Sequence, residues 1–270
     1  MSGRKPMQIV DAHAHIFTQD MPLNDQPRHK PDYDFTVEDY LAQLDKHQIH
    51  FGVIAAASPW SDYNDYIIDS VRNNPRLRGT VIVKPGVEKY ILQLMKQDGI
   101  VGVRLPFIGL QQQPDLTKFA YRRLLRRIVD LDWHVHLHVE AHHLTELIPQ
   151  LEASGVKIVI DHFGRLTSIK GDNEQAFQMM VASIKKGRTW VKASGAYRIG
   201  EGAAEVLRAL LDKVGDDRLL WASDCPFVGE ESNVTYEKTI QWLDDLLPDE
   251  SSKRKVFSEN GIALYGFTDE

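Results

Sequence analysis

The 270-residue sequence predicts a closed (β/α)8 TIM barrel, an α/β fold in which helices surround eight parallel strands. Short apolar runs alternate with amphipathic helical stretches along the whole chain, and parallel strands need such crossover helices. Eight strand–helix units fit the length of this barrel, about 250 residues. An open doubly wound sheet is the alternative. Its nucleotide-binding form is disfavoured, because no G-x-G-x-x-G follows the first strand and no Walker A motif occurs.

The first half of the chain supplies four of these units. A polar, proline-bearing loop over residues 18–35 follows the first strand, and long loops in compact domains are often functional. The helix after it begins at a capping box of Thr36 and Asp39. The expected elements are strand 8–17, helix 35–49, strand 50–58, helix 62–75, strand 79–83, a helix around Ile91–Met95, strand 100–107 and helix 117–131.

The second half continues the alternation without a repeat, linker or low-complexity segment, so we expect one domain over residues 1–270. Its helices carry apolar residues at helical spacing, and its strands are short apolar runs. The expected elements are strand 133–141, a helix around Leu144–Leu151, strand 156–164, helix 173–186, strand 189–197, helix 201–213, strand 218–227, helix 233–247 and a helical tail over 251–264.

Composition excludes several classes of protein. The net charge is -6, from 32 basic and 38 acidic residues, which argues against a nucleic-acid-binding surface. No apolar run reaches the length of a membrane span, and no signal-peptide core follows the N-terminal basic residues. A single cysteine, Cys225, rules out an internal disulfide and fits a reducing compartment. We therefore expect a cytoplasmic protein.

Polar side chains gather at the carboxyl ends of the predicted strands, where the active sites of such barrels lie. Helices separate these residues in the sequence, and the barrel would bring them to one mouth. In chain order they are His13, His15, Ser58, Trp60, Lys84, Arg104, His138, Glu140, Asp161, His162, Lys192, Ser194, Tyr197, Arg198 and Asp224.

The histidines are the first candidates for site residues. His13 and His15 are two apart, so both project from one face of their strand, and they could hold a metal or a substrate oxygen. On the fifth strand His138 is nearest the mouth, whereas His134 and His136 are expected to be structural. At the sixth strand we expect His162 in the site, and Asp161 orienting a neighbour or capping a loop.

Two charged residues end apolar strands. Arg104 needs an anion, either a protein carboxylate or an acidic group of a ligand, and the ligand is favoured. Asp224 is the general-base candidate: burial would raise its pKa, and a neighbouring cation or metal would lower it. Cys225 faces away from Asp224 and precedes a proline, which disfavours it as a nucleophile.

With these residues in place, the chain resembles the amidohydrolase superfamily, in particular its amidohydrolase-related branch of TIM-barrel lactonases. The resemblance runs essentially end to end. Its motifs are DAHAHIF, GVRLPF, WHVHLHVEA, VIDHFGR, VKASGAYR, LLWASDCPF and ENGIALYGF.

The resemblance implies hydrolysis of a lactone, a cyclic ester of a sugar acid or of an intermediate of aromatic catabolism. Asp224 would activate water, His13, His15 and His162 would polarise the carbonyl, and Arg104 would assist the carbonyl oxygen or bind an acidic group. Ser58, Trp60, His138, Tyr197 and Arg198 are expected at the substrate. For Trp60 and Tyr197, packing over the barrel rim is the alternative.

Three departures from the branch concern substrate and metal. Members that hydrolyse pyrone dicarboxylates have an arginine where Leu110 stands and a tyrosine where His138 stands, and both differences count against that particular substrate for this chain. The histidine completes a set matching the zinc ligands of metal-dependent relatives: His13, His15, His138 and Asp224. No strand-4 lysine is present to bridge two metals, so we expect either no required cofactor or one divalent ion, zinc above all.

The sequence leaves two other functions open. One is a mononuclear zinc-dependent decarboxylase or amidohydrolase on the same barrel, which needs a tightly held metal and which is supported by His138 as a candidate ligand. The other is a non-catalytic binding protein, which is disfavoured because no expected site residue is missing. The expected partners are a small-molecule lactone or carboxylate and a second copy in a homodimer, with no nucleic acid and no membrane.

Overall fold

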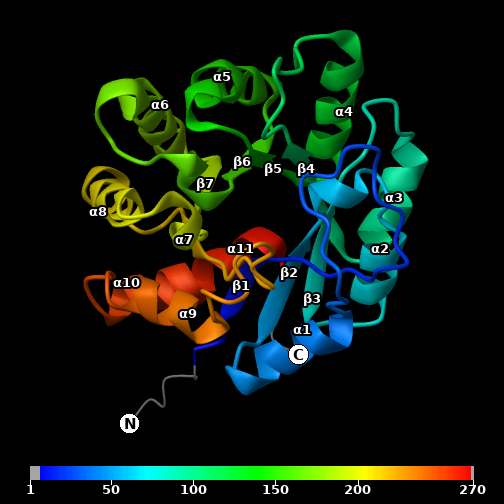
Figure 1. Cartoon of the computed structure of the whole chain (residues 1–270). Coiled ribbons are helices and arrows are strands. Elements are labelled where there is room, and N and C mark those ends of the chain that lie inside the picture. The colour runs from blue at the N-terminus through cyan, green and yellow to red at the C-terminus, as the bar shows by residue number, and fades with distance from the viewer. Residues whose placement is uncertain (1–6, 269–270) are drawn as a thin grey trace.

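Eight parallel strands form one sheet in the order β1 to β8, with the helices around it, in this computed structural model describing residues 7–268 (Figure 1). Contacts between the first and last strands close the sheet. The backbone N–H of His15 donates to the carbonyl of Cys225 at 2.8 Å, and that of Asp224 to the carbonyl of His13 at 2.9 Å. The predicted (β/α)8 barrel is confirmed.

The elements follow the predicted alternation. The strands are β1 Val10–Ala14, β2 Phe51–Ala55, β3 Leu77–Val81, β4 Ile100–Pro106, β5 His134–His138, β6 Lys157–Ile160, β7 Thr189–Ala193 and β8 Leu219–Trp221. The α-helices are α1 Val37–Lys46, α2 Asp65–Arg72, α3 Lys89–Gln97, α4 Phe119–Asp130, α5 Leu144–Ser154, α6 Glu174–Lys185, α7 Ala196–Ile199, α8 Gly202–Val214, α9 Tyr236–Asp244, α10 Glu250–Arg254 and α11 Asn260–Tyr265. Shorter turns are η1 Ser58–Trp60, η2 Ala141–His143, η3 His162–Arg165, η4 Gly171–Asn173 and the π-helical η5 Lys255–Glu259.

Local details refine these expectations. The capping box of Thr36 and Asp39 starts α1 as predicted. The third strand ends at Val81, earlier than expected, because the backbone N–H and carbonyl of Ile82 bond to the side chain of Asn64. The Lys84 side chain is exposed and pairs with Asp62 at 3.2 Å, so it is not part of the site. The helical tail is divided into α10, η5 and α11.

A buried carboxylate, Asp11, ties the start of the barrel to its end. Its Oδ2 accepts hydrogen bonds from the hydroxyls of Ser223 at 2.6 Å, Tyr236 at 2.7 Å and Tyr40 at 3.1 Å, while the Ser223 backbone N–H donates to Oδ1 at 2.8 Å. Burial raises the pKa of Asp11, although these donors stabilise its charge. Asp11 therefore fixes β1 against the segment after β8, and with it the residues that follow.

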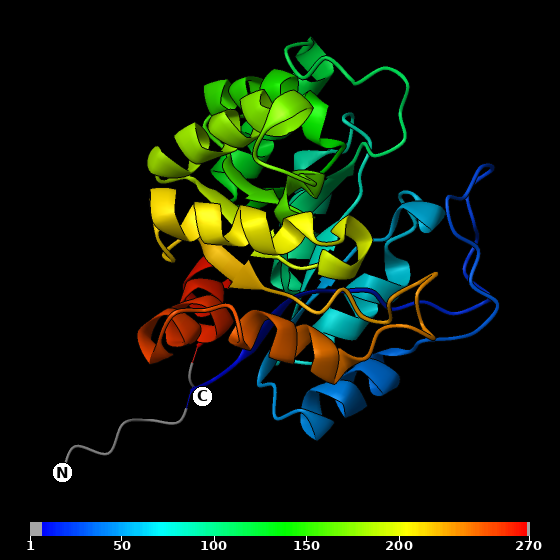
Figure 2. The ribbon, with the colours of Figure 1, turned by 60° about the vertical axis from the view of Figure 1, so that its left-hand side comes forward.

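The loops after the strands gather at one end of the barrel. Figure 2 shows the segment after β1, in dark blue, standing out at this end together with the η1 turn and the orange segment after β8. The aromatic rings of Phe17 and Trp60 stack 4.9 Å apart, which joins the first two of these loops. Within residues 7–268 no helix combines the length and the apolarity needed to cross a bilayer.

Candidate active site

A cavity of about 60 Å³ that is open to solvent lies at the carboxyl ends of the strands. The structure brings most of the predicted site residues to its wall. Those that line it are His15, Ser58, Trp60, Arg104, His138, His162, Arg198 and Asp224. His13 and Tyr197 are not in the lining: His13 is fully buried beneath it, and Tyr197 reaches Asp224 from the side.

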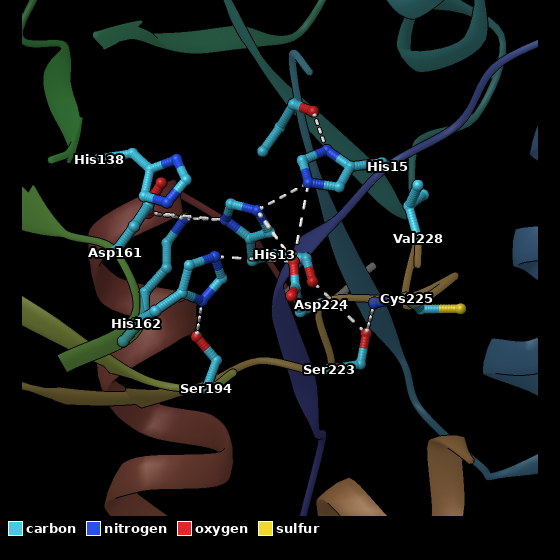
Figure 3. A network of polar contacts seen from close by, with 12 residues as sticks. His13, His15, His138, Asp161, His162, Ser194, Ser223, Asp224, Cys225 and Val228 are labelled. Atoms are coloured by element: carbon cyan, nitrogen blue, oxygen red, sulfur yellow. Dashed lines mark hydrogen bonds and ion pairs between the residues drawn. The ribbon is translucent and has the colours of Figure 1, made fainter. Parts of the chain in front are cut away.

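Asp224 has one oxygen held by the protein and one directed at imidazoles. Its Oδ2 accepts hydrogen bonds from the Tyr197 hydroxyl at 2.6 Å and from Arg198 Nε at 2.8 Å. Its Oδ1 lies 3.6 to 3.7 Å from the Nε2 atoms of His13, His15 and His162 (Figure 3). The backbone φ of 64° is an unusual value for aspartate, of the kind found at functional sites.

The charge of Asp224 persists at neutral pH. Burial raises the pKa of this carboxyl, but the imidazoles of His162, His13 and His15, when protonated, and the permanent charge of Arg198 favour the carboxylate, so the pKa lies well below its usual range. Arg198 supplies a permanent positive charge among these neighbours. Asp224 is therefore ionised and able to accept a proton through Oδ1.

His13 and His15 form a directed hydrogen-bond chain. The Nδ1 of His15 lies 2.7 Å from the carbonyl of Ala55, which is an acceptor only, so His15 carries its proton on Nδ1 and presents a lone pair on Nε2. The Nε2 of His13 lies 3.1 Å from that atom and must be the donor. This pattern assigns an Nε2–H to His13 and leaves its Nδ1 as an acceptor.

Lys192 lies beneath His13 in a fully buried polar cluster. Its Nζ is 2.7 Å from His13 Nδ1, 2.9 Å from His136 Nδ1 and 2.9 Å from Asp161 Oδ1. Burial lowers the pKa of Lys192 to about 8, although Asp161 favours the charged amine. Asp161 is thus part of an internal ion-pair network rather than of the cavity wall.

Arg104 and His138 form a second pair at the wall. Arg104 donates from Nε to Asp161 Oδ2 at 3.0 Å and from Nη1 to the carbonyl of Ala56 at 2.8 Å, so a protein carboxylate pairs with it while it also lines the cavity. Its Nη2 lies 3.1 Å from His138 Nδ1, which must accept because a guanidinium only donates. His138 therefore carries an Nε2–H, and that buried atom has no partner in the described chain.

The cavity histidines are neutral. Burial, followed by the charge of Arg104, lowers the pKa of His15 to about 4. Burial likewise lowers the pKa of His162 to about 4, against the opposing effect of Asp224. His162 is also held by the Ser194 hydroxyl, 2.8 Å from its Nδ1. Neutral imidazoles at fixed positions can serve as hydrogen-bond donors or as metal ligands.

The spacing of one group suits a single metal ion. Ligand atoms of His13, His15 and Asp224 lie within 4.8 Å of one another, and the two Nε2 atoms are 3.1 Å apart, near the roughly 3.4 Å that two nitrogens take on tetrahedral zinc. His138, the fourth predicted ligand, is not in this group. The hydrogen-bond pattern does not fit the ion, however, because the Nε2 of His13 carries a proton where a ligand needs a lone pair.

Sequence reasoning missed three side chains in the lining, two arginines and a histidine: Arg28, Arg165 and His29. Arg28 and His29 come from the loop between β1 and α1, whose length was the only signal for them. Arg165 stands in the DHFGR motif, one turn after His162. Its Nη1 is buried and, within residues 7–268, has no hydrogen-bond partner.

Several known proteins are similar to this chain in sequence and in fold over nearly its whole length. The family model described as "Amidohydrolase" matches residues 10–267. The 4-sulfomuconolactone hydrolase of Hydrogenophaga intermedia is 28% identical over 268 residues, covering 95% of this chain and 88% of that protein. A crystal structure from Acinetobacter baumannii, described as a probable 2-pyrone-4,6-dicarboxylic acid hydrolase with citric acid bound, has a TM-score of 0.90 at 30% identity, covering 97% of this chain and 100% of that one. A structure of similar description from Pseudomonas putida has a TM-score of 0.89 at 34% identity, covering 98% and 100%.

Proposed function

The chain belongs to the amidohydrolase family, and from that premise we propose that it hydrolyses an unsaturated lactone carrying two acidic groups. One observation carries the proposal: an ionised Asp224, with its free Oδ1 among three imidazoles, stands at the wall of an arginine-lined cavity. Ester hydrolysis needs a base for water and donors for the developing oxyanion, and both lie here.

The charge of the wall supports a substrate with more than one anionic group. Four arginines line the cavity. Arg104 is paired with Asp161 and Arg198 with Asp224, whereas Arg28 and Arg165 have no carboxylate within ion-pair distance in the described chain. Two relatives are named for substrates with sulfonate or paired carboxylate groups, and one was crystallised with a tricarboxylic acid. Guanidinium groups bind carboxylates and sulfonates well.

The remaining wall supports a flat, unsaturated ring over a polyhydroxylated sugar lactone. Phe17 and Trp60 stack on one another, and Pro31, Pro59 and Val228 complete an apolar side. A sugar lactone would need hydroxyl partners along this side, which these residues do not supply.

The reaction assigns separate tasks to the groups at the wall. Asp224 Oδ1 takes a proton from the attacking water, and Tyr197 and Arg198 hold the other oxygen so that Oδ1 stays oriented. The Nε2–H of His138 and the imidazole of His162 donate to the carbonyl oxygen as it gains negative charge. Asp224 then returns the proton to the leaving ring oxygen. His13, which lies beneath the wall, holds His15 in place by donating from its Nε2 to the Nε2 of His15. Arg104 orients His138 by donating to its Nδ1.

No cofactor is required in this account, because lactones are activated esters and the site supplies donors of its own. A mononuclear zinc enzyme, acting on an amide or removing a carboxyl group, is the second candidate. The spacing of His13, His15 and Asp224 favours it, and the proton on His13 opposes it.

A substrate panel tests the proposal. The purified full chain is assayed, as prepared and after chelator treatment, against 4-sulfomuconolactone, 2-pyrone-4,6-dicarboxylate, an aldonolactone and the corresponding amides. We expect hydrolysis of the dianionic lactones in both preparations, with little turnover of the aldonolactone or amides. Turnover of amides alone, or activity that returns only with added zinc, would contradict the proposal.

A further inference from the structure

Lys192 is a charged side chain that the proposed reaction does not use. It is fully buried on β7 and does not line the cavity. An ammonium group has three N–H donors and no acceptor. The groups that face Nζ are His13 on β1, His136 on β5 and Asp161 directly after β6, at 2.7 to 2.9 Å. Each imidazole nitrogen must present a lone pair to the ammonium, and Asp161 pairs with its charge.

This contact decides where His13 carries its proton. If the proton were on Nδ1, two N–H groups would meet at 2.7 Å, and two lone pairs on Nε2 of His13 and His15 would meet at 3.1 Å. Both contacts would be repulsive. With the proton on Nε2, one run of hydrogen bonds leads from Lys192 through His13 and His15 to the carbonyl of Ala55.

We propose that Lys192 is a positioning residue that fixes His13 in its Nε2–H tautomer, so that the site presents a proton there rather than a metal-binding lone pair. Asp161 is the competing partner, with Oδ1 3.5 Å from His13 Nδ1. Without the ammonium, His13 can donate from Nδ1 to Asp161 and open its Nε2. Carboxylate-oriented histidines of this kind are the usual metal ligands.

The experiment compares wild type, Lys192→Met and a matched control, Lys157→Met, which removes a strand lysine that pairs with Asp132 away from the site. Nitrogen-15 spectra of histidine-labelled full chain, assigned through His13→Gln, report which ring nitrogen carries the proton. We expect Nε2–H on His13 in wild type and the control, and Nδ1–H in Lys192→Met. Zinc affinity, measured by competition with a chelating dye, should rise about 10- to 100-fold in Lys192→Met alone.

An Nδ1–H on His13 in the wild type would overturn the proposal, as would a zinc affinity that falls or stays constant in a folded Lys192→Met variant. If Lys192→Met does not fold, the wild-type nitrogen-15 spectrum alone tests the proposal, because it shows which ring nitrogen of His13 carries the proton. The inference concerns the site of the proposed function, yet its readouts need no substrate. A failed lactone panel with the expected spectra would therefore reject the function and leave the role of Lys192 standing.

Discussion

Replacing Arg28 tests whether the β1–α1 loop recognises a second acidic group. Arg28 lines the cavity, and partial burial together with the charges of Arg165 and Arg198 lowers its pKa, as expected where like charges gather. A hydrogen bond to a charged group contributes about 1.5–3 kcal/mol, and an exposed ion pair about 0.2–1 kcal/mol. Arg28 is exposed but stands at the wall, so we expect about 1–2 kcal/mol, or about 5- to 30-fold in kcat/KM.

The assay is a cycle of two enzymes and two substrates. Wild type and Arg28→Met are compared on 2-pyrone-4,6-dicarboxylate and on 2-pyrone-6-carboxylate, which lacks one acidic group. Lys30→Met, an exposed lysine two residues along the loop, controls for the loss of charge. We expect the loss on the dicarboxylate and less than about twofold change on the monocarboxylate, because a pairwise contact appears only where both partners are present. Equal losses on both substrates would refute a specific contact.

Three further substitutions or conditions test the architecture of the site. Burial holds the pKa of His15 and His162 at about 4 and that of His134 at about 3, so between pH 6.5 and 4 the unfolded chain binds more protons than the folded chain. As the pH is lowered through this range, urea unfolding should show the free energy of unfolding falling by up to about 1.4 kcal/mol per pH unit for each histidine. An unchanged free energy of unfolding from pH 7 to 5 would contradict this. Asp11→Ala leaves the buried hydroxyls of Ser223, Tyr236 and Tyr40 without their acceptor. Thermal unfolding should show that the free energy of unfolding falls by at least about 3 kcal/mol, and by less than about 0.5 kcal/mol for the control Asp217→Ala, which changes an exposed residue. Gly195→Ala would place a methyl group 2.9 Å from His162 Nδ1 and force alanine into a φ of 62°. We expect the displaced imidazole to lower kcat about tenfold or more, and the backbone strain to lower the free energy of unfolding by about 1–2 kcal/mol. An unchanged kcat would show that the position of His162 does not matter for the reaction.

The barrel and its mouth were predictable because both follow from local patterns. Apolar runs and helical spacing identify the strands and helices, and a barrel brings strand ends together whatever the sequence separation. That rule correctly directed attention to His162 and Asp224, which the structure places at one cavity.

The partners of these residues were not predictable, because they depend on distances between strands. The sequence could not show that Arg104 is neutralised by Asp161, or that Lys192 meets His13 and His136 beneath the cavity. The position of Arg28 at the cavity was not predicted for another reason: it lies in a loop, and a loop has no periodicity from which to infer the direction of a side chain.

The most direct test of the account measures kcat for Asp224→Asn on 2-pyrone-4,6-dicarboxylate, with Asp217→Asn as the matched control. The amide introduced by Asp224→Asn keeps the shape of the side chain but cannot take a proton, and Asp217 is exposed and pairs with Lys255. We predict a loss of about 100-fold or more for an Asp224→Asn variant that still folds, although its thermal unfolding midpoint falls because Arg198 loses a buried carboxylate partner, and we predict wild-type activity in the control. A folded Asp224→Asn variant with activity within a few-fold of wild type would contradict a base-catalysed lactone hydrolysis at this site.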